Sequence, residues 1–221
     1  PSYTITDLGT LDPQGADARA INDHNVVIGV AYVPAKYPEH KRIFVWSSGV
    51  MTDIAPNRGY HEYGLNNHDE IVGNTLGADG LSHGFYRSAE GVMRMLDLSN
   101  GTRTDAYGIN DAGDIAGGTV QVAPGYSGHA IRWPARGAPV DLGNFGYDNA
   151  SAVAVNQLGQ MLIAFNSTWM GVLDGATVSG GILWSPNAPP VLVTDLSGPF
   201  PTGFVEAMND SGVVVGTTDL P

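Results

Sequence analysis

The run Ala-Tyr-Gly-Ile-Asn-Asp-Ala-Gly-Asp-Ile-Ala-Gly at residues 106–117 holds the pattern that decides the fold of this 221-residue chain. Two short apolar segments flank a polar stretch that starts at Asn110 and has glycine at its fourth position, Gly113. Asn suits the first position of a turn because its side chain can bond the backbone two residues further on, and glycine tolerates positive φ. The stretch therefore predicts two antiparallel strands joined by a tight turn.

This pattern occurs five times along the chain. The repeated Asn is residue 22, 66, 110, 156 and 209, so successive copies are 44, 44, 46 and 53 residues apart. All fourth turn positions hold residue types that tolerate positive φ: Asn25, Asp69, Gly113, Gly159 and Gly212. A second apolar element follows each turn: Val27-Ile28-Gly29, Ile71-Val72-Gly73, Ile115-Ala116-Gly117, Leu162-Ile163-Ala164 and Val214-Val215-Gly216. The recurrence assigns the five Asn residues to turns rather than to catalysis.

Two further elements complete each copy. The third is Phe44–Trp46, His83–Arg87, His129–Trp133 and Gly181–Trp184. The fourth is Met51–Ile54, Met95–Leu98, Val140–Gly143 and Val193–Leu196, and Ile5–Gly9 also matches it. Four short strands in about 44 residues are typical of one blade of a β-propeller.

The chain is therefore predicted to be all-β, a single β-propeller domain over residues 1–221 with about five four-stranded blades. The repeats are expected at roughly 10–54, 55–98, 99–143, 144–196 and 197–221, the last completed by 1–9, so that the two termini share one blade. First strands are expected at about 16–22, 60–66, 104–110, 150–156 and 203–209. The shared blade has no third element, which leaves open a monomer with a short blade, an oligomer whose partner chain completes it, and a fragment of a longer protein.

Composition limits the class of partner. Ten basic and twenty-two acidic residues give a net charge of −12, which disfavours nucleic acid and anionic membranes. Cysteine is absent, which excludes disulfides and thiolate chemistry. No apolar run reaches the ~18 residues of a membrane helix. The chain opens at Pro1 rather than Met, which is compatible with removal of a leader.

The third element, with the Ile-Asn-Asp-x-Gly turn and the Asp-Leu-Gly ending, resembles the HAF repeat of probable bacterial extracellular proteins. His83-Gly84-Phe85 and His129-Ala130-Ile131 carry the resemblance, together with Trp133 where Trp is usual. The chain departs from the repeat at Arg42 and Gly180, where His is usual, and at Arg87 in place of Trp. The resemblance implies an extracellular or cell-surface location in bacteria and brings no catalytic residues with it.

Candidate site residues lie where the copies differ, because positions common to all copies carry structure. The repeated Asp7, Asp53, Asp97, Asp141 and Asp195 are expected to bond backbone at strand ends, and His83 and His129 to be structural. Five residues before each repeated Asn, at the expected channel mouth, stand Asp17, His61, Asp105, Ser151 and Phe204. The candidate acid–base residues are Asp17, His61, Asp105 and Glu206. The candidate ligand-binding residues are Arg58, Tyr60, Arg103, Tyr147 and Trp169.

These residues favour a secreted or surface binding module that recognises a glycan or small ligand at the channel mouth. The alternative is a carbohydrate-active or other small-molecule enzyme that uses acid–base residues at the same place. No cofactor or metal site is expected, with calcium as a weaker alternative because carboxylates are abundant and suit that ion.

Overall fold

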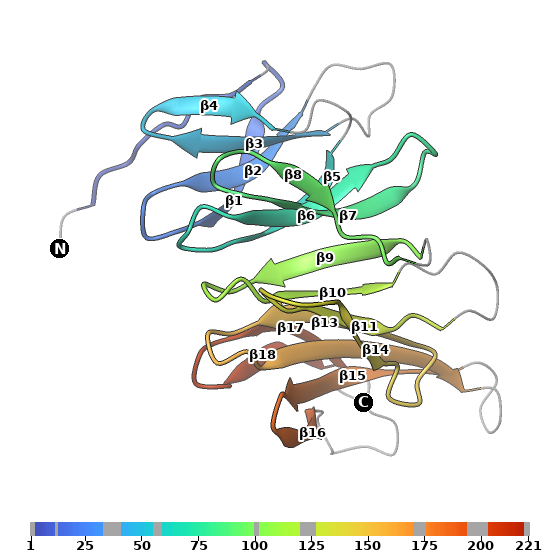
Figure 1. Ribbon diagram of the computed structural model, residues 1–221. Coiled ribbons are helices and arrows are strands. Elements are labelled where there is room, and N and C mark those ends of the chain that lie inside the picture. Colours follow the sequence, from blue (N-terminus) through green and yellow to red (C-terminus); the bar gives the residue numbers. More distant parts are fainter. Residues whose placement is uncertain are drawn as a thin grey trace. The chain divides into compact units, whose positions relative to one another are not determined.

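The computed structural model describes residues 3–11, 13–32, 41–54, 59–99, 102–119, 127–169, 176–193 and 203–218. These residues form strands β1 to β18 and contain no helix (Figure 1). The chain divides into two compact units, Pro1–Met95 and Leu96–Pro221, which are described in turn.

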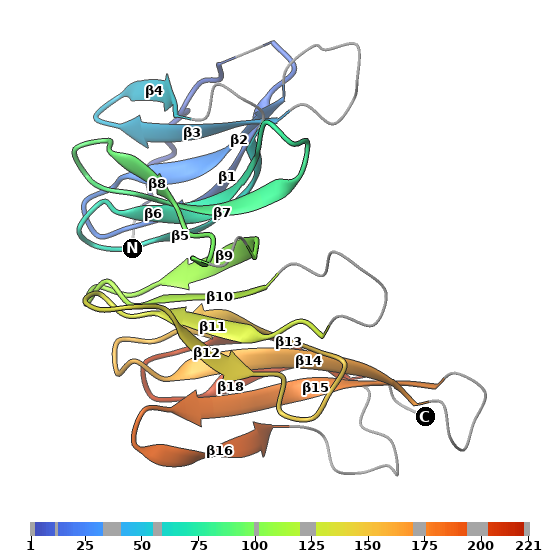
Figure 2. The ribbon, with the colours of Figure 1, turned by 45° about the vertical axis from the view of Figure 1, so that its right-hand side comes forward.

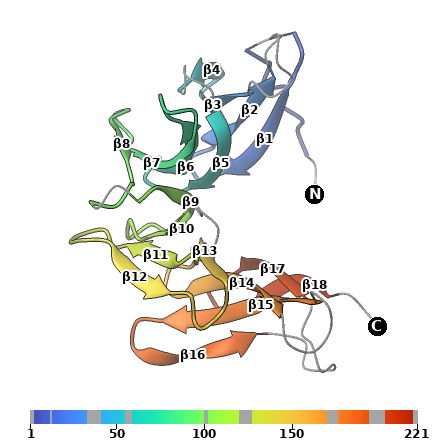
Figure 3. The same ribbon diagram turned by 90° about the vertical axis from the view of Figure 1, so that its right-hand side faces the viewer.

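The first unit contains two four-stranded antiparallel meanders. One is β1 (Ala16–Ile21), β2 (Val27–Tyr32), β3 (Lys41–Ser47) and β4 (Val50–Asp53). The other is β5 (Gly59–Leu65), β6 (Ile71–Leu76), β7 (Ser82–Arg87) and β8 (Met93–Met95), whose order can be followed in Figure 3. One bridge between Lys41 and Gly59 joins the two meanders into a continuous sheet.

The second unit contains two more four-stranded sheets and one hairpin. The first sheet is β9 (Thr104–Ile109), β10 (Ile115–Thr119), β11 (Ala130–Trp133) and β12 (Val140–Gly143). The second is β13 (Asn149–Val155), β14 (Met161–Trp169), β15 (Ala176–Ser185) and β16 (Ala188–Val193), seen as four adjacent ribbons in Figure 2. The hairpin is β17 (Gly203–Met208) and β18 (Val214–Thr218).

The all-β prediction is confirmed, and so is the repeat of four antiparallel strands. The observed first strands, β1, β5, β9, β13 and β17, agree with the predicted ones to within one residue at either end. No sheet closes on itself in the described part of the chain, so the ring of a propeller remains a prediction.

Two predictions about the strands need correction. Ile5–Gly9 was expected to be a fourth strand, but residues 3–10 form no strand, and Ile5 is 96% exposed. The physical reason is that a fourth strand pairs with a third, and the described residues supply no third strand to this repeat. In the fourth repeat the element Leu162-Ile163-Ala164 is displaced by one residue, because Ile163 pairs with Ala152 just as Gly29 pairs with Ala18.

The five turns have the predicted geometry. The fourth turn residue has φ of 59° at Asn25 and Asp69, 84° at Gly113, 72° at Gly159 and 76° at Gly212. Its backbone N–H donates to the carbonyl of the repeated Asn in all five turns. The Asn side-chain oxygen also accepts backbone N–H groups inside its own turn, for example from His24 and Val26 at Asn22. The prediction that these residues are turn residues is confirmed.

The same Asn side chains also connect neighbouring repeats. Asn22 Nδ2 donates to the carbonyl oxygen of Asn66 at 3.0 Å. Asn110 Nδ2 donates to the carbonyl of Asn156 at 2.9 Å, and Asn156 Nδ2 to the carbonyl of Asn209 at 3.3 Å. The sequence pattern did not predict these bonds between repeats, because it shows spacing along the chain and not contacts across it.

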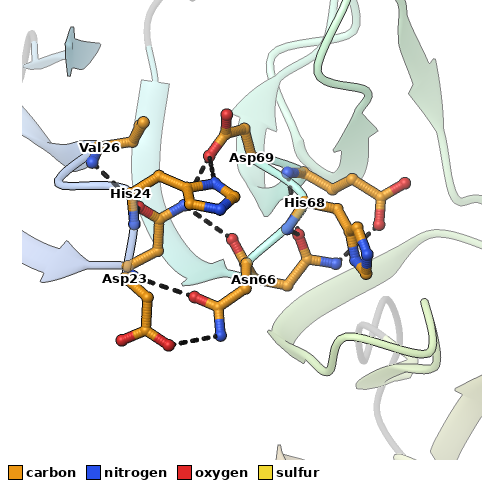
Figure 4. A network of polar contacts seen from close by, with 9 residues as sticks. Asp23, His24, Val26, Asn66, His68 and Asp69 are labelled. Carbon is orange, nitrogen blue, oxygen red and sulfur yellow. Dashed lines mark hydrogen bonds and ion pairs between the residues drawn. The ribbon is translucent and has the colours of Figure 1, made fainter. Parts of the chain in front are cut away.

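Figure 4 shows this connection between the first two turns. Asp23 N–H donates to Asn67 Oδ1, and Asn67 Nδ2 donates back to Asp23 Oδ2, both at 3.0 Å. Asp69 Oδ1 accepts from Asn22 Nδ2 at 2.6 Å and lies 3.4 Å from His24 Nδ1. The polar groups of this cluster bind each other, which indicates a structural role in joining the two repeats.

Each first strand carries a β-bulge at an equivalent place. The pairing with the second strand skips one residue, three positions before the repeated Asn: Arg19, Tyr63, Tyr107, Val153 and Glu206. A bulge bends its strand and redirects the side chain of the extra residue. Glycine stands opposite in four repeats, and Ile163 takes this place in the fourth. The backbone comes close there: a Cβ on Gly29 would overlap the carbonyl oxygen of Asp17, and one on Gly117 that of Asp105.

Candidate functional site at the first strands

The positions that differ most between repeats form one pair of residues on each first strand. One member lies five residues before the repeated Asn, and the other is the bulge residue two positions later. We call these the first-strand pairs: Asp17 and Arg19, His61 and Tyr63, Asp105 and Tyr107, Ser151 and Val153, and Phe204 and Glu206. The repeats thus share a backbone geometry and present a different pair of side chains at each first strand.

In the first unit, Asp17 is the centre of a small polar group. Asp17 Oδ2 accepts a hydrogen bond from the Tyr32 hydroxyl at 2.6 Å, and Arg19 Nη2 lies 3.5 Å from the same oxygen. Lys41 Nζ lies 5.9 Å from the centre of the Tyr32 ring. The Asp17 side chain is 48% exposed, so the group combines a fixed carboxylate, an aromatic ring and two cations at the protein surface.

The residue that occupies the position of Asp17 on the neighbouring first strand is His61. The backbone of His61 lies in β5 and pairs with Asn74, as the backbone of Asp17 pairs with Val30. Strands β1 and β5 lie close together within this unit. The side chains of His61, Tyr60 and Tyr63 lie outside the described part of the structure, and Arg58 lies outside it altogether.

In the second unit, Asp105 also accepts from a tyrosine, which here is the bulge residue of its own strand and not a residue of the second strand. The Tyr107 hydroxyl donates to Asp105 Oδ2 at 3.4 Å, so the bulge residue contacts the acid two positions before it. Arg103 is half-buried immediately before β9. Next along the chain, Ser151 lies against Gly118 of β10, where an added Cβ would be 2.6 Å from Ser151 Oγ. Glu206 is the exposed bulge residue of β17.

Two other predicted ligand-binding residues lie elsewhere in the second unit. The Tyr147 ring stacks on Phe165 with centroids 3.7 Å apart and 12° between the planes, at the edge of a hydrophobic cluster. One face of this ring is therefore covered by a core residue. Trp169 ends β14 and its backbone pairs with Ala176, while its side chain lies outside the description.

Three of the five repeated acids bond backbone as expected, and both repeated histidines lie beside an acid. The side-chain oxygens of Asp7, Asp97 and Asp141 accept the backbone N–H groups of Gly9, Thr104 and Gly143. Asp53 pairs with Arg42 at 3.2 Å, and Asp195 falls outside the described residues. His83 lies 3.1 Å from Asp79, and His129 lies 2.9 Å from Asp141.

In the first unit, the pKa of the Tyr86 hydroxyl is raised well above its ordinary value. Burial and the hydrogen bond that its hydroxyl donates to Glu70 raise the pKa of Tyr86 to about 12. Glu70 also accepts from Asn66 Nδ2 at 2.7 Å, and the Arg94 guanidinium lies 4.6 Å from the centre of the Tyr86 ring. Because Asn66 belongs to the turn that binds Asn22, Tyr86 supports the connection between the two repeats.

Within the described ranges, no three His, Asp or Glu side chains gather so that they could hold a metal ion. Over the same residues, no helix is long and apolar enough to cross a membrane.

Comparison with known proteins bears on the fold alone. No family model matches the chain, and no curated protein matches it. Among solved structures, the crystal structure of TolB from Acinetobacter baumannii is similar, with a TM-score of 0.55 at 12% sequence identity. The match covers 90% of this chain and 53% of the TolB chain, so the chain spans about half the length of that structure. TolB is a β-propeller neighbour, which agrees with the four-stranded antiparallel sheets observed here.

Sequence reasoning found one member of each first-strand pair and missed most of the others. Asp17, His61 and Asp105 stood out because they vary at a fixed distance from the repeated Asn. Arg19 and Tyr107 were not singled out, although they also vary at a fixed distance, three residues before the Asn. The available signal was the recurring glycine of the second strand, since a glycine repeated at one strand position marks a bulge or a close backbone approach.

Proposed function

We propose that the chain is a secreted or surface-displayed β-propeller module that binds a glycan or small polar ligand at its first strands. The five repeats would form the ring, with the first strands innermost and the first-strand pairs around the opening of its channel. The four-stranded sheets and the likeness to TolB support the ring. The resemblance of the third element to the HAF repeat supports the extracellular location.

The observation that carries the proposal is the matched environment of Asp17 and Asp105. Each carboxylate lies five residues before a repeated Asn, and each accepts a hydrogen bond from a tyrosine hydroxyl, Tyr32 or Tyr107. A carboxylate has two oxygens with two lone pairs each, so it can accept from a tyrosine and from ligand hydroxyls at the same time. An aromatic ring beside such an acceptor gives a sugar both a stacking face and a hydrogen-bonding partner.

The repeat supports binding over catalysis. Two repeats each place an acid beside a tyrosine hydroxyl at the first strand, although the tyrosine comes from β2 in one and from β9 itself in the other, and a binding surface can use similar groups more than once. Gly80-Leu81-Ser82-His83-Gly84 has the Gly-x-Ser-x-Gly spacing of a hydrolase nucleophile elbow, but Ser82 begins strand β7 instead of a strand-to-helix turn, and the sequence has no His-Glu-x-x-His. The enzyme alternative therefore rests only on the presence of Asp17, His61, Asp105 and Glu206 and is decided by the same experiment.

The test is a glycan array with the purified chain, followed by titration of each hit by calorimetry. Asp17→Asn and Asp105→Asn should each weaken binding by about tenfold or more, because a charge-assisted hydrogen bond is replaced by a neutral one. Glu90→Gln is the matched control, since it also removes one negative charge but lies on the exposed turn between β7 and β8. The Glu90→Gln variant should bind each array hit with the same affinity as the unmodified chain.

Two outcomes would contradict the proposal. If both Asp variants bind the ligand with full affinity, the ligand does not bind at the first strands. Cleavage of an array hit by the unmodified chain, lost in Asp17→Asn or Asp105→Asn, would replace binding by the enzyme alternative.

A further inference from the structure

Two cations beside the first strands have no acidic partner in the described part of the chain. Three other basic residues, Arg19, Arg42 and Arg132, each form an ion pair with a carboxylate. Lys41 and Arg103 form no ion pair with any described residue. The chain has a net charge of −12, so a shortage of carboxylates does not explain this. Their positions therefore suggest that these two cations serve a ligand.

In the first unit, the Tyr32 side chain connects the amine of Lys41 to the carboxylate of Asp17. Lys41 Nζ lies 5.9 Å from the centre of the Tyr32 ring, and the Tyr32 hydroxyl donates to Asp17 Oδ2 at 2.6 Å. Arg19 Nη2 lies 3.5 Å from the same oxygen and balances its charge. One acid and two bases thus leave a local excess of positive charge on a strongly acidic chain.

In the second unit, the alternation of side chains along β9 places Arg103 on the same face as Asp105. Thr104 and Ala106 are fully buried, whereas Arg103, Asp105 and Tyr107 are only partly buried. Successive side chains of a strand point to opposite faces, so the partly buried residues share one face. The contact between the Tyr107 hydroxyl and Asp105 agrees with this. A guanidinium therefore stands next to an acid and a tyrosine without pairing with the acid.

The two places contain the same three chemical groups: a carboxylate, a tyrosine and a cation without an acidic partner. A carboxylate accepts hydrogen bonds from sugar hydroxyls. An ammonium or guanidinium group binds an anionic oxygen through charge-assisted hydrogen bonds. A neutral sugar would leave the cation unused, and a small anion without hydroxyls would be repelled by the carboxylate. A ligand that suits all three groups has hydroxyls and a negative charge on one skeleton.

We propose that the ligand of the first strands is an acidic sugar, whose ring carries a carboxylate or sulfate group beside its hydroxyls. The inference rests on the proposed function, because it names the class of glycan that binds there. Lys41 binds the anionic group and Asp17 a hydroxyl in the first unit, and Arg103 and Asp105 do so in the second. The net charge of the chain opposes binding only weakly, since salt screens exposed charges beyond about 8 Å.

The test is calorimetry with matched pairs of oligosaccharides that differ in charge alone. Two pairs are an oligogalacturonate and an oligoglucuronate, each with its methyl ester, and a third is a sulfated galactan fragment with its desulfated form. In at least one pair, the charged member should bind about tenfold or more tightly than the neutral one. The pair with the larger difference identifies carboxylate or sulfate as the anionic group.

Variants separate the two kinds of contact. The double variant Lys41→Gln, Arg103→Gln should bind both members of a pair with affinities within about twofold of each other. Asp17→Asn should weaken both members alike, because the hydroxyls are common to them. Arg136→Gln is the matched control, since it removes one positive charge from the exposed turn between β11 and β12 and should leave the preference unchanged. Circular dichroism confirms that each variant is folded.

Three outcomes would overturn the inference and leave the proposed function standing. One is equal affinity of the unmodified chain for the charged and neutral members of every pair. Another is a preference for the charged member that persists in the double variant. The third is tighter binding of a free dipeptide, whose ammonium and carboxylate groups also suit an acid and a cation. Failure to bind any glycan, charged or neutral, would instead contradict glycan binding itself.

Discussion

At the scale of the residue, the repeated Asn joins two functions in one side chain. Its oxygen accepts backbone N–H groups of its own turn, as Asn156 accepts from Leu158 and Gln160. Its nitrogen donates to the next repeat, as Asn156 does to the carbonyl of Asn209. Aspartate would keep the first function and lose the second, and serine is too short for both. The amide provides both functions at Asn22, Asn110 and Asn156, and at Asn66 its nitrogen donates to Glu70 instead.

The fourth turn residue gives the first prediction. Gly113→Val should lower the free energy of unfolding by about 1–2 kcal/mol or more relative to Ala112→Val, because a β-branched residue resists positive φ. Gly113 has φ of 84°, while Ala112 is an exposed turn residue with no such requirement. Chemical denaturation of the two variants measures the difference. Equal stability would show that the turn does not need its left-handed residue.

Tyr86 gives a prediction about pH. Tyr86→Phe should destabilise the chain by about 1–3 kcal/mol near neutral pH, because it removes a hydrogen bond to a charged group, Glu70. The folded pKa of Tyr86, about 12, is above the ordinary value of 10.0. The stabilisation is therefore complete below pH 10 and is lost as the pH rises towards 12. Urea titrations of both proteins from pH 7 to 11 should show curves that converge at the alkaline end, and a constant difference would contradict this assignment.

At the scale of the element, each first strand carries a bulge at the same place, and β5 has a second irregularity between Gly59 and His61. The bulge places two variable side chains close together, as the contact between Tyr107 and Asp105 shows. The sequence predicted the strands well because alternating apolar residues and turn residues act locally. It did not predict the bulge, because a bulge is a mismatch between two strands and becomes visible only when their register is known. The pairing of Arg19 with Asp17 was missed for the same reason.

The connection between repeats gives a prediction at this scale. Asn156→Ala should cost about 1–3 kcal/mol more than Asn209→Ala, because only Asn156 donates to the carbonyl of a following repeat and because it is buried. Both variants lose the same two bonds inside their own turns, since Asn209 accepts from Ser211 and Val213. Asn156 Nδ2 also donates to Gln160 Oε1 at 2.8 Å, where the last repeat has Val213, so the difference measures this bond together with the bond between repeats. Thermal unfolding followed by circular dichroism measures the difference in stability between the two variants. Equal melting temperatures would show that Asn156 acts as a turn residue alone.

At the scale of the whole molecule, the sequence predicted the number of repeats and their four-stranded form. The four spacings between the five Asn residues were sufficient for the number of repeats, because each repeat is a local unit. Closure of the ring is a different kind of property, since it depends on how the first and last repeats meet. The strand expected at Ile5–Gly9 shows the limit: its sequence fits, but a strand forms only beside a partner.

Closure can be measured in solution. If the five repeats form one ring, the chain should have a radius of gyration of about 17 Å, the value for a compact single domain of this length. Two compact units that move independently would scatter as a larger particle. Small-angle X-ray scattering at low protein concentration makes the measurement, and a radius well above that value with a bimodal distance distribution would contradict the ring.

The bond between repeats always ends on a main-chain carbonyl, whether that of Asn66, Asn156 or Asn209. Every amino acid has such a carbonyl, but the backbone N–H after the Asn also donates to a side chain of the next repeat, Asn67, Gln157 or Asp210. The connection therefore needs an acid or amide after each repeated Asn, and all five copies have one. A gene that duplicates or deletes one whole repeat would therefore yield a chain in which the new neighbours are bonded in the same way. Each duplicated or deleted repeat would carry its own first-strand pair. Such events would therefore change the combination of side chains at the first strands without removing the hydrogen bonds between repeats.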